Sequence, residues 1–310
     1  MSTLHLLVPG NALAGTLGAS HLLQPRQKEP ARLEPGAAAA RRGGFTLVEL
    51  VAVMAILALG VTMLAPALAR ARTNGKAVQC LYNQRQLAAA WQMYAADNND
   101  RLAINSDGFE LPSSYPVSWA GGFVDWSPSP LNTNTLYLTE DRSSLLAAYT
   151  ARSAEIFWCP TDTYLSPAQR LLGWTHRIRS VAMNAAVSDG NKDLGISWRS
   201  SFWWARKTGD LTAPGPSQSW VFLDEHPDSI DDTVFYANPG FTNGTGQFTE
   251  LPASDHSGAC GIAFADGHAE IHRWLERGTL LPVGSAFTGP ISVVNNADLA
   301  WLAQHTPRRP

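Results

Sequence analysis

The sequence is poor in charge and in cysteine, and both shortages narrow the classes of protein it could encode. Only 16% of its 310 residues are charged and the net charge is −3, so no basic face argues for nucleic-acid binding. The three cysteines include no Cys-x-x-Cys pair, which disfavours a zinc ribbon or a thioredoxin-like motif. An EF-hand spacing, a Gly-x-Ser-x-Gly elbow and a phosphate-binding loop are also missing.

Charged and apolar residues are distributed unevenly at the N-terminus. Residues 1–44 are rich in Ala, Gly and Pro and carry a net charge of +3. Residues 45–69 follow with 25 residues and a single charge, Glu49. Because about 20 apolar residues in a helix cross a bilayer, this run predicts a membrane span behind a basic leader. A carboxylate is costly inside lipid, so Glu49 is expected to be functional.

The helix is expected to continue beyond the membrane to about residue 100. Residues 70–98 contain no proline, and Cys80, Leu87, Trp91 and Tyr94 share one stripe of a helix. From about residue 101, short apolar runs alternate with clusters of Gly, Pro, Asn and Asp. This layout predicts an α+β fold, in which one long helix packs on an antiparallel sheet.

We expect four parts: a leader over 1–44, a helix over 45–100, a β-rich globular domain over 101–280, and a loop-like tail over 281–310. Candidate strands cover 181–183, 220–223, 261–264 and 269–274, and a short helix is expected over 143–149. The pair Asp266-Gly267 separates the last two strands and predicts a hairpin about a type I′ turn, with Ile262 opposite Ile271.

The start of the apolar run resembles the type IV prepilin signal. Its residues are Gly43-Gly44-Phe45-Thr46-Leu47-Val48-Glu49-Leu50. The resemblance implies that a prepilin peptidase cuts between Gly44 and Phe45 on the cytoplasmic side and that the new Phe45 amine is N-methylated. It also implies that Glu49 pairs with the N-terminal amine of a neighbouring subunit during assembly.

A second resemblance covers about residues 45–275. His256 is separated by nine residues from Asp266-Gly267, which resembles the C-terminal "His-x9-Asp-Gly" motif of bacterial pseudopilin-like proteins. The resemblance implies a non-enzymatic structural subunit of a type IV pilus or a type II secretion-like pseudopilus. It implies a single pass of the inner membrane, a periplasmic or extracellular globular domain, and other pilin-like subunits as partners.

Several residues are candidates for sites in the globular domain. Asp224, Glu225 and Asp228 lie in a stretch dense in carboxylates, which suits Ca²⁺, although a solvated acidic loop is the favoured interpretation. No other cofactor is expected. His256 is expected to hydrogen-bond to the turn at Asp266, as a structural lock.

A disulfide is expected between Cys80 and Cys159, because both should lie outside the cytoplasm, where such bonds persist. Cys80 lies on the helix stripe that faces the sheet, and Cys159 lies in an apolar segment expected to dock there. Cys260 should remain a buried thiol in the hairpin.

Two further functional hypotheses stay open at this point. The chain could be a membrane-anchored extracytoplasmic binding protein for Ca²⁺ or a glycan. It could also be an extracytoplasmic hydrolase that uses the carboxylates of 224–232 together with His256.

Overall fold

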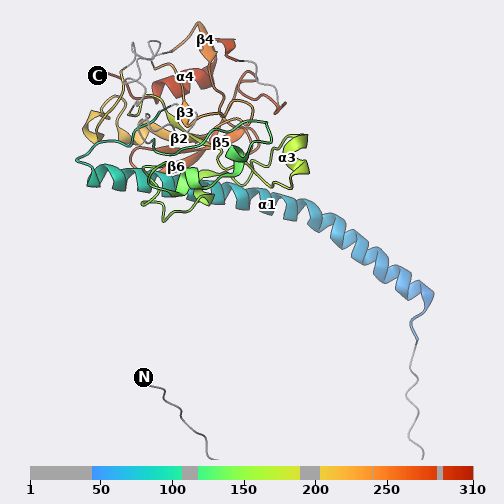
Figure 1. Cartoon of the computed structure of the whole chain (residues 1–310). Coiled ribbons are helices and arrows are strands. Elements are labelled where there is room, and N and C mark those ends of the chain that lie inside the picture. The colour runs from blue at the N-terminus through green and yellow to red at the C-terminus, as the bar shows by residue number, and fades with distance from the viewer. Residues whose placement is uncertain (1–43, 107–117, 189–202, 240, 285–288, 310) are drawn as a thin grey trace, which may run out of the picture. The chain divides into compact units, whose positions relative to one another are not determined.

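The computed structural model describes residues 44–106, 118–188, 203–239, 241–284 and 289–309 (Figure 1). The expected leader lies outside these residues except for Gly44. The chain divides into two units, residues 1–56 and 57–310, and the division falls inside helix α1. Helix α1 covers Leu47–Asp97, so a single helix contains the apolar run and the amphipathic stretch that were expected.

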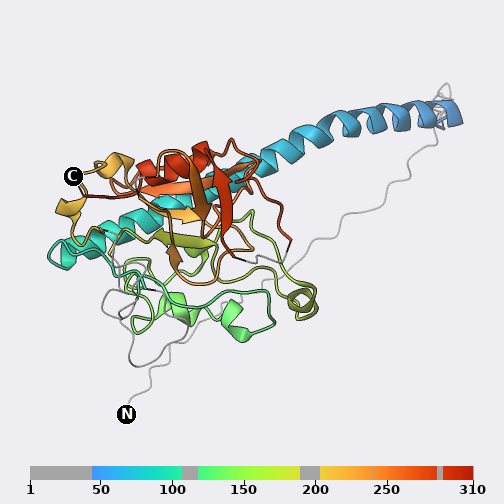
Figure 2. The same cartoon turned by 90° about the horizontal axis from the view of Figure 1, so that it is seen from above.

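The second part of α1 packs along one face of a sheet (Figures 1 and 2). Cys80, Leu87 and Trp91 are buried there and Tyr94 is partly buried, which confirms the predicted stripe. The helix ends at Asp97, close to the expected residue 100, and Asn99 then takes a positive φ that Asn and Asp tolerate better than most residues.

The sheet has five strands in the order β3-β1-β2-β5-β6, and all neighbours are antiparallel except β1 and β3. The four predicted strands are confirmed as β1, β2, β5 and β6. The five strands are β1 (Val181–Asn184), β2 (Trp220–Asp224), β3 (Val234–Phe235), β5 (Ala259–Phe264) and β6 (Ala269–Arg273). The fold is therefore α+β, as expected.

Strand β5 lies in the middle of this packing and is buried on both faces. Ala263 lies in the apolar cluster that contains Leu87 and Trp91 of α1. Ile262 and Phe264 lie in a second cluster, with residues of β2 and the C-terminal helix. Small residues on the α1 side and large ones on the other side allow the helix to approach the strand closely.

The hairpin between β5 and β6 exists, but its predicted register is wrong by one residue. Ile262 pairs with Glu270, not with Ile271. Phe264 N donates to His268 O, and Gly267 N donates to Phe264 O, so the loop has three residues. Gly267 alone takes a positive φ, of 93°, as expected for a type I turn closed by a G1 bulge and not for a type I′ turn.

The prediction of a loop-like C-terminal tail is also wrong. Residues 291–294 form β7, which pairs with β4 in a separate two-stranded sheet, and α4 follows. The Asn296 side chain caps α4 by accepting a bond from Leu299 N at 2.8 Å. The elements are β4 (Thr245–Phe248), β7 (Ile291–Val294) and α4 (Ala297–Gln304).

The short helix expected over 143–149 is a series of hydrogen-bonded turns. Two other short helices precede β1, α2 (Leu136–Thr139) and α3 (Pro167–Leu171).

Candidate functional site

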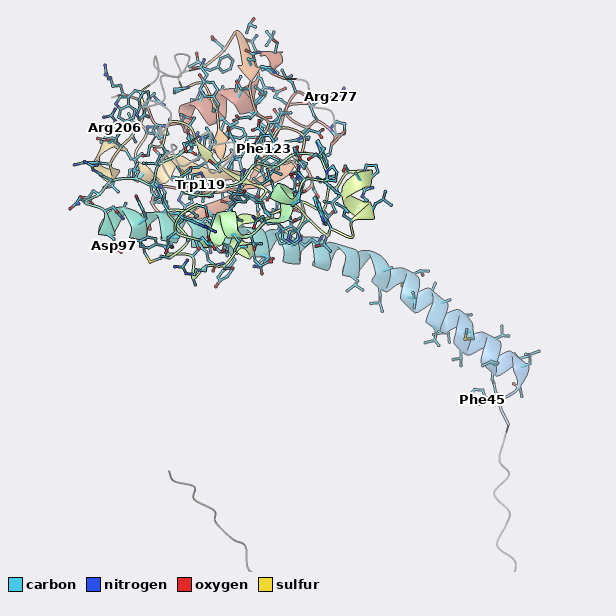
Figure 3. All side chains as sticks on the ribbon, viewed as in Figure 1. Phe45, Asp97, Trp119, Phe123, Arg206 and Arg277 are labelled. Carbon is cyan, nitrogen blue, oxygen red and sulfur yellow. The ribbon has the colours of Figure 1, made fainter. Side chains whose placement is uncertain are left out.

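The expected processing site lies in an exposed segment that precedes the first turn of α1. Residues 44–46 have no regular secondary structure, and Phe45, labelled in Figure 3, is 78% exposed. An exposed, non-helical peptide bond is the kind that proteases reach. The geometry at Gly44 and Phe45 is therefore compatible with cleavage between them.

Thr46 and Glu49 form a reciprocal cap at the start of α1. Glu49 Oε2 accepts hydrogen bonds from Thr46 N at 2.8 Å and from Thr46 Oγ1 at 2.9 Å. Thr46 Oγ1 in turn accepts a bond from Glu49 N at 3.2 Å. This is a capping box, which satisfies backbone donors at the helix N-terminus. Both bonds to the carboxylate use Oε2, so they do not occupy Oε1.

The helix that follows the cap is long and apolar enough to cross a membrane. This stretch, Leu47–Ala65, has 19 residues, and none of them is buried. Exposed apolar side chains over such a length have no favourable environment in water, whereas a bilayer core of about 30 Å would accommodate them. The segment is consistent with a single-pass membrane anchor.

A second group of candidate residues comes together deep inside the globular domain. One ligand atom from each of Cys80, Cys159, Asp224 and His256 lies within 4.8 Å of the others. Cys80 Sγ donates to Asp224 Oδ2 at 2.9 Å, and Cys159 Sγ lies 3.3 Å from His256 Nε2. All four residues are buried, with exposed fractions between 1% and 7%.

The expected disulfide is not formed in this structure, where all three cysteines are free thiols. The two cysteines of the predicted disulfide do lie close together, since Cys80 and Cys159 belong to the same buried group. Cys260 is a fully buried thiol on β5, as expected. The interaction with the Cys159 thiol, followed by burial and the nearby Asp224 carboxylate, raises the pKa of the Cys80 thiol well above its ordinary value.

The expected hydrogen bond between His256 and the Asp266 turn is absent. His256 Nε2 lies near Cys159 Sγ and, at 3.4 Å, Thr161 Oγ1. Asp266 is exposed and accepts a hydrogen bond from His268 N at 3.1 Å within its own turn. The two halves of the motif therefore have separate structural roles: His256 enters the buried cluster, and Asp266-Gly267 forms the hairpin turn.

The three candidate calcium ligands do not form one site. Asp224 faces the buried cysteines, while Glu225 Oε1 accepts a hydrogen bond from Ser229 Oγ at 2.9 Å. Asp228 Oδ2 accepts one from Gly284 N at 2.7 Å. Successive side chains at the end of β2 point in opposite directions, so Asp224 and Glu225 are adjacent in sequence but face different partners.

Another acidic group does assemble, from Asp231, Asp232 and Glu250. Its oxygens accept hydrogen bonds from backbone amides, including Val234 N on Asp232 Oδ1 at 2.7 Å and Tyr236 N on Glu250. These carboxylates therefore cap the backbone. The favoured interpretation of a solvated loop is wrong for this stretch, because Asp224, Glu225 and Asp232 are buried.

The sequence pattern did not identify several buried charged residues of the globular domain. Asp162 and Arg177 are both buried, with Arg177 Nη2 3.7 Å from Asp162 Oδ2. Burial raises the pKa of Asp162 and raises that of Asp255 to about 7. Burial also lowers the pKa of Arg179, whose Nη1 donates to Val181 O at 2.8 Å. No pattern of spacing marks these residues, because their neighbours come from distant segments.

The Cys159–His256 pair has the separation of a nucleophile and a base. Both side chains are buried. Nucleophilic dyads need a third group that orients the base. Burial lowers the pKa of His256, and its Nδ1 has no hydrogen-bond partner among the described residues.

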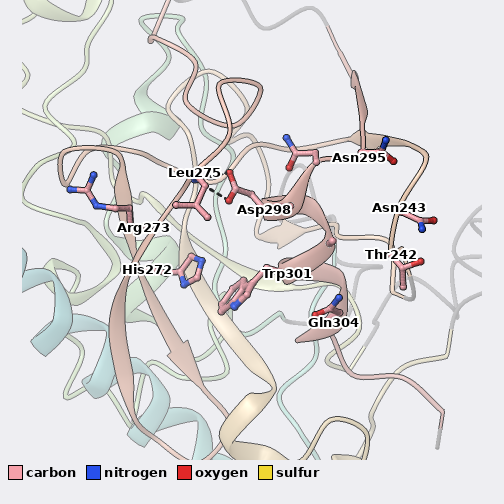
Figure 4. A pocket seen from close by; sticks show the side chains of 12 residues that line it. Thr242, Asn243, His272, Arg273, Leu275, Asn295, Asp298, Trp301 and Gln304 are labelled. Atoms are coloured by element: carbon pink, nitrogen blue, oxygen red, sulfur yellow. Dashed lines mark hydrogen bonds between the residues drawn. The ribbon is translucent and has the colours of Figure 1, made fainter.

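An open cavity of about 720 Å³ lies beside α4, lined by residues that include His272, Trp301 and Asn243 (Figure 4). An aromatic ring with a free face would offer a stacking surface to a ligand in this cavity. The rings of His272 and His305 stack on the Trp301 ring at centroid distances of 3.7 and 4.1 Å. Two imidazoles this close cannot share one face, so both faces of Trp301 are covered.

Comparison with known proteins bears on the N-terminal segment alone. Residues 39–65 match the family described as the prokaryotic N-terminal methylation motif. The match covers the cleavage junction, the capping box and the apolar span. It supports a pilin-like subunit that is processed by a prepilin peptidase and assembles with similar subunits. No curated protein and no solved structure matches the chain significantly.

Proposed function

We propose that this chain is a non-enzymatic structural subunit of a type IV pilus or a type II secretion-like pseudopilus. A prepilin peptidase removes the leader between Gly44 and Phe45, and the Phe45 amine is methylated. The helix Leu47–Ala65 holds the subunit in the inner membrane, and the globular domain lies outside the cytoplasm. The observation that carries the proposal is the methylation motif over residues 39–65, which coincides with an exposed apolar helix.

Glu49 is the residue through which assembly is expected to act. In a single subunit its carboxylate is exposed, and among the described residues it accepts hydrogen bonds from Thr46 through Oε2. In lipid such a carboxylate is costly unless it meets a positive charge. The free amine of Phe45 on a neighbouring subunit would supply that charge. It could bind Glu49 Oε1, because the capping box uses only Oε2.

The structure of the globular domain supports this role over the alternatives. The Cys159–His256 pair is buried, the three candidate calcium ligands are separated, and both faces of Trp301 are covered. A buried thiol–imidazole pair and a covered Trp301 ring suit a filament subunit better than a hydrolase or a glycan-binding protein.

Paired substitutions at Glu49 test the proposal. Glu49→Ala removes both the charge and the cap, whereas Glu49→Gln removes the charge and keeps a side chain that capping boxes accept. We expect both variants to be inserted and cleaved, and both to be absent from sheared filaments. The measurement is immunoblotting of the membrane and filament fractions in cells that also express the wild-type protein.

The Gln variant separates charge from helix capping. If Glu49→Gln entered filaments at the wild-type level while Glu49→Ala did not, the residue would act through the cap. If both variants entered normally, the proposed assembly role of Glu49 would be refuted.

A further inference from the structure

The buried group of Cys80, Cys159, Asp224 and His256 has the composition of a transition-metal site. Two thiols, one imidazole and one carboxylate are all ligands that zinc takes, and structural zinc sites have four of them in a tetrahedron. Zinc bonds of about 2.0 to 2.3 Å place neighbouring ligand atoms roughly 3.3 to 3.8 Å apart. The four atoms here lie within 4.8 Å of one another, and the Cys159 Sγ to His256 Nε2 distance is 3.3 Å.

We propose that these four residues bind one Zn²⁺ ion, which joins helix α1 to the sheet and its loops. The ligands come from four separate segments: α1, the loop that follows residues 155–157, the end of β2, and the loop before β5. A single ion would therefore connect parts of the chain that are up to 176 residues apart, from Cys80 to His256.

Groups around the ligands hold them in place, as outer partners do at metal sites. Asp224 Oδ2 accepts from Gly261 N at 3.2 Å, and its Oδ1 lies 3.4 Å from the Ser180 hydroxyl. Thr161 Oγ1 lies 2.8 Å from Cys159 Sγ. These contacts orient a carboxylate oxygen and a sulfur toward the common centre.

The local charge favours a cation. Asp162 and Asp224 are both buried, each with an exposed fraction of 2%, and the half-buried Asp255 directly precedes His256. The buried Arg177 lies on the Asp162 side of this region, with its Nη2 3.7 Å from Asp162 Oδ2. A divalent ion would offset the cost of burying these carboxylates, because opposite charge favours the ionised form.

A zinc site and a Cys80–Cys159 disulfide exclude each other, because a thiolate must be free to bind the metal. The buried arrangement favours the metal. His256 and Asp224 contact the two thiols directly, and a disulfide would leave both polar groups buried without those contacts.

The test uses the full chain extracted from membranes in detergent, and Zn²⁺ alone as the probe. We expect about one zinc per chain by elemental analysis, with Cys80 and Cys159 reduced. After the bound zinc is removed with a chelator, added Co²⁺ should give a thiolate-to-cobalt charge-transfer band. Zn²⁺ should then displace the Co²⁺ and abolish the band. Both readouts use the wild-type protein, so they do not depend on the folding of a variant.

Variants identify the ligands. His256→Gln removes a ligand but leaves both thiols able to form a disulfide, and Cys159→Ser removes both possibilities. Each should weaken zinc binding by about 100-fold or more, since even outer partners contribute 10- to 100-fold. Cys260→Ser is the matched control, because Cys260 is equally buried but lies outside the group.

Three results would overturn the proposal. The first is wild-type protein that binds neither Zn²⁺ nor Co²⁺ when reduced. The second is an intact mass and peptide map that show a Cys80–Cys159 disulfide in the extracted protein. The third is zinc binding that His256→Gln leaves unchanged, or that Cys260→Ser weakens as much as Cys159→Ser does.

Discussion

Single residues decide how closely helix α1 can approach strand β5. A Cβ added at Gly261 would lie 2.6 Å from Cys80 Sγ and 2.8 Å from Asp224 Oδ2. Both distances are shorter than contacts that side chains make, so one of the two groups would have to move. Gly261 is therefore needed for its lack of a side chain, and its amide also donates to Asp224.

Gly261→Ala should destabilise the globular domain. Inserting a methyl group into a well-packed core costs typically 1 to 3 kcal/mol. For a domain of this size that corresponds to a decrease in Tm of several degrees, at roughly 2 to 4 °C per kcal/mol. The measurement is thermal unfolding of the detergent-extracted protein, followed by near-ultraviolet circular dichroism.

Gly209→Ala is the control for that substitution, because a Cβ there meets no atom within 4 Å and the backbone conformation is an ordinary one. An equal Tm for Gly261→Ala and Gly209→Ala would show that α1 and β5 are not packed as described.

At the same scale, sequence reasoning could find some members of the buried group but not the group itself. The helical stripe placed Cys80 against the sheet, and the apolar surroundings of Cys159 placed it nearby. The acidic neighbours of Asp224 in the sequence favour an acidic loop. Its partners include Cys80, which is 144 residues away along the chain, and no local pattern reports such a contact.

Among the secondary-structure elements, the C-terminal ones differ most from expectation. Strand β7 has four residues and α4 has eight, too few for a clear hydrophobic period. One signal was present: Asn296 precedes an apolar run, as N-cap residues do. The hairpin turn illustrates a different limit, because a Gly after Asp suits both a two-residue turn and a three-residue loop.

Leu302→Ala should reveal the contribution of α4. Leu302 is fully buried against the second apolar cluster, and its carbonyl accepts a hydrogen bond from Trp220 Nε1 at 3.2 Å. Truncating a buried leucine costs about 2 to 5 kcal/mol. We expect a clear loss of stability in chemical denaturation, with the transition moved to lower denaturant.

Leu171→Ala serves as the comparison, since Leu171 is 89% exposed at the end of α3. If the two substitutions had the same small effect, the C-terminal segment would not be part of the folded core.

For the whole molecule, the sequence was sufficient to predict the fold class and the four main strands. Periodicity identified the long helix, and alternation with turn residues identified the sheet, because both depend on local burial. The order of strands, the parallel pairing of β1 with β3, and the buried charges depend on distant contacts. Those contacts are set by packing among segments, which a single sequence does not display.

The central claim is that the chain is processed as a prepilin and anchored by its mature N-terminus. It is tested most directly by the intact mass of the membrane-extracted protein from cells with and without the prepilin peptidase. With the peptidase, we expect the mature chain to begin at Phe45 and carry one additional methyl group. Without it, and in a variant in which Gly44 is replaced by a bulky residue, we expect the leader to remain attached. An N-terminus at another residue, or the same mass with and without the peptidase, would contradict the account.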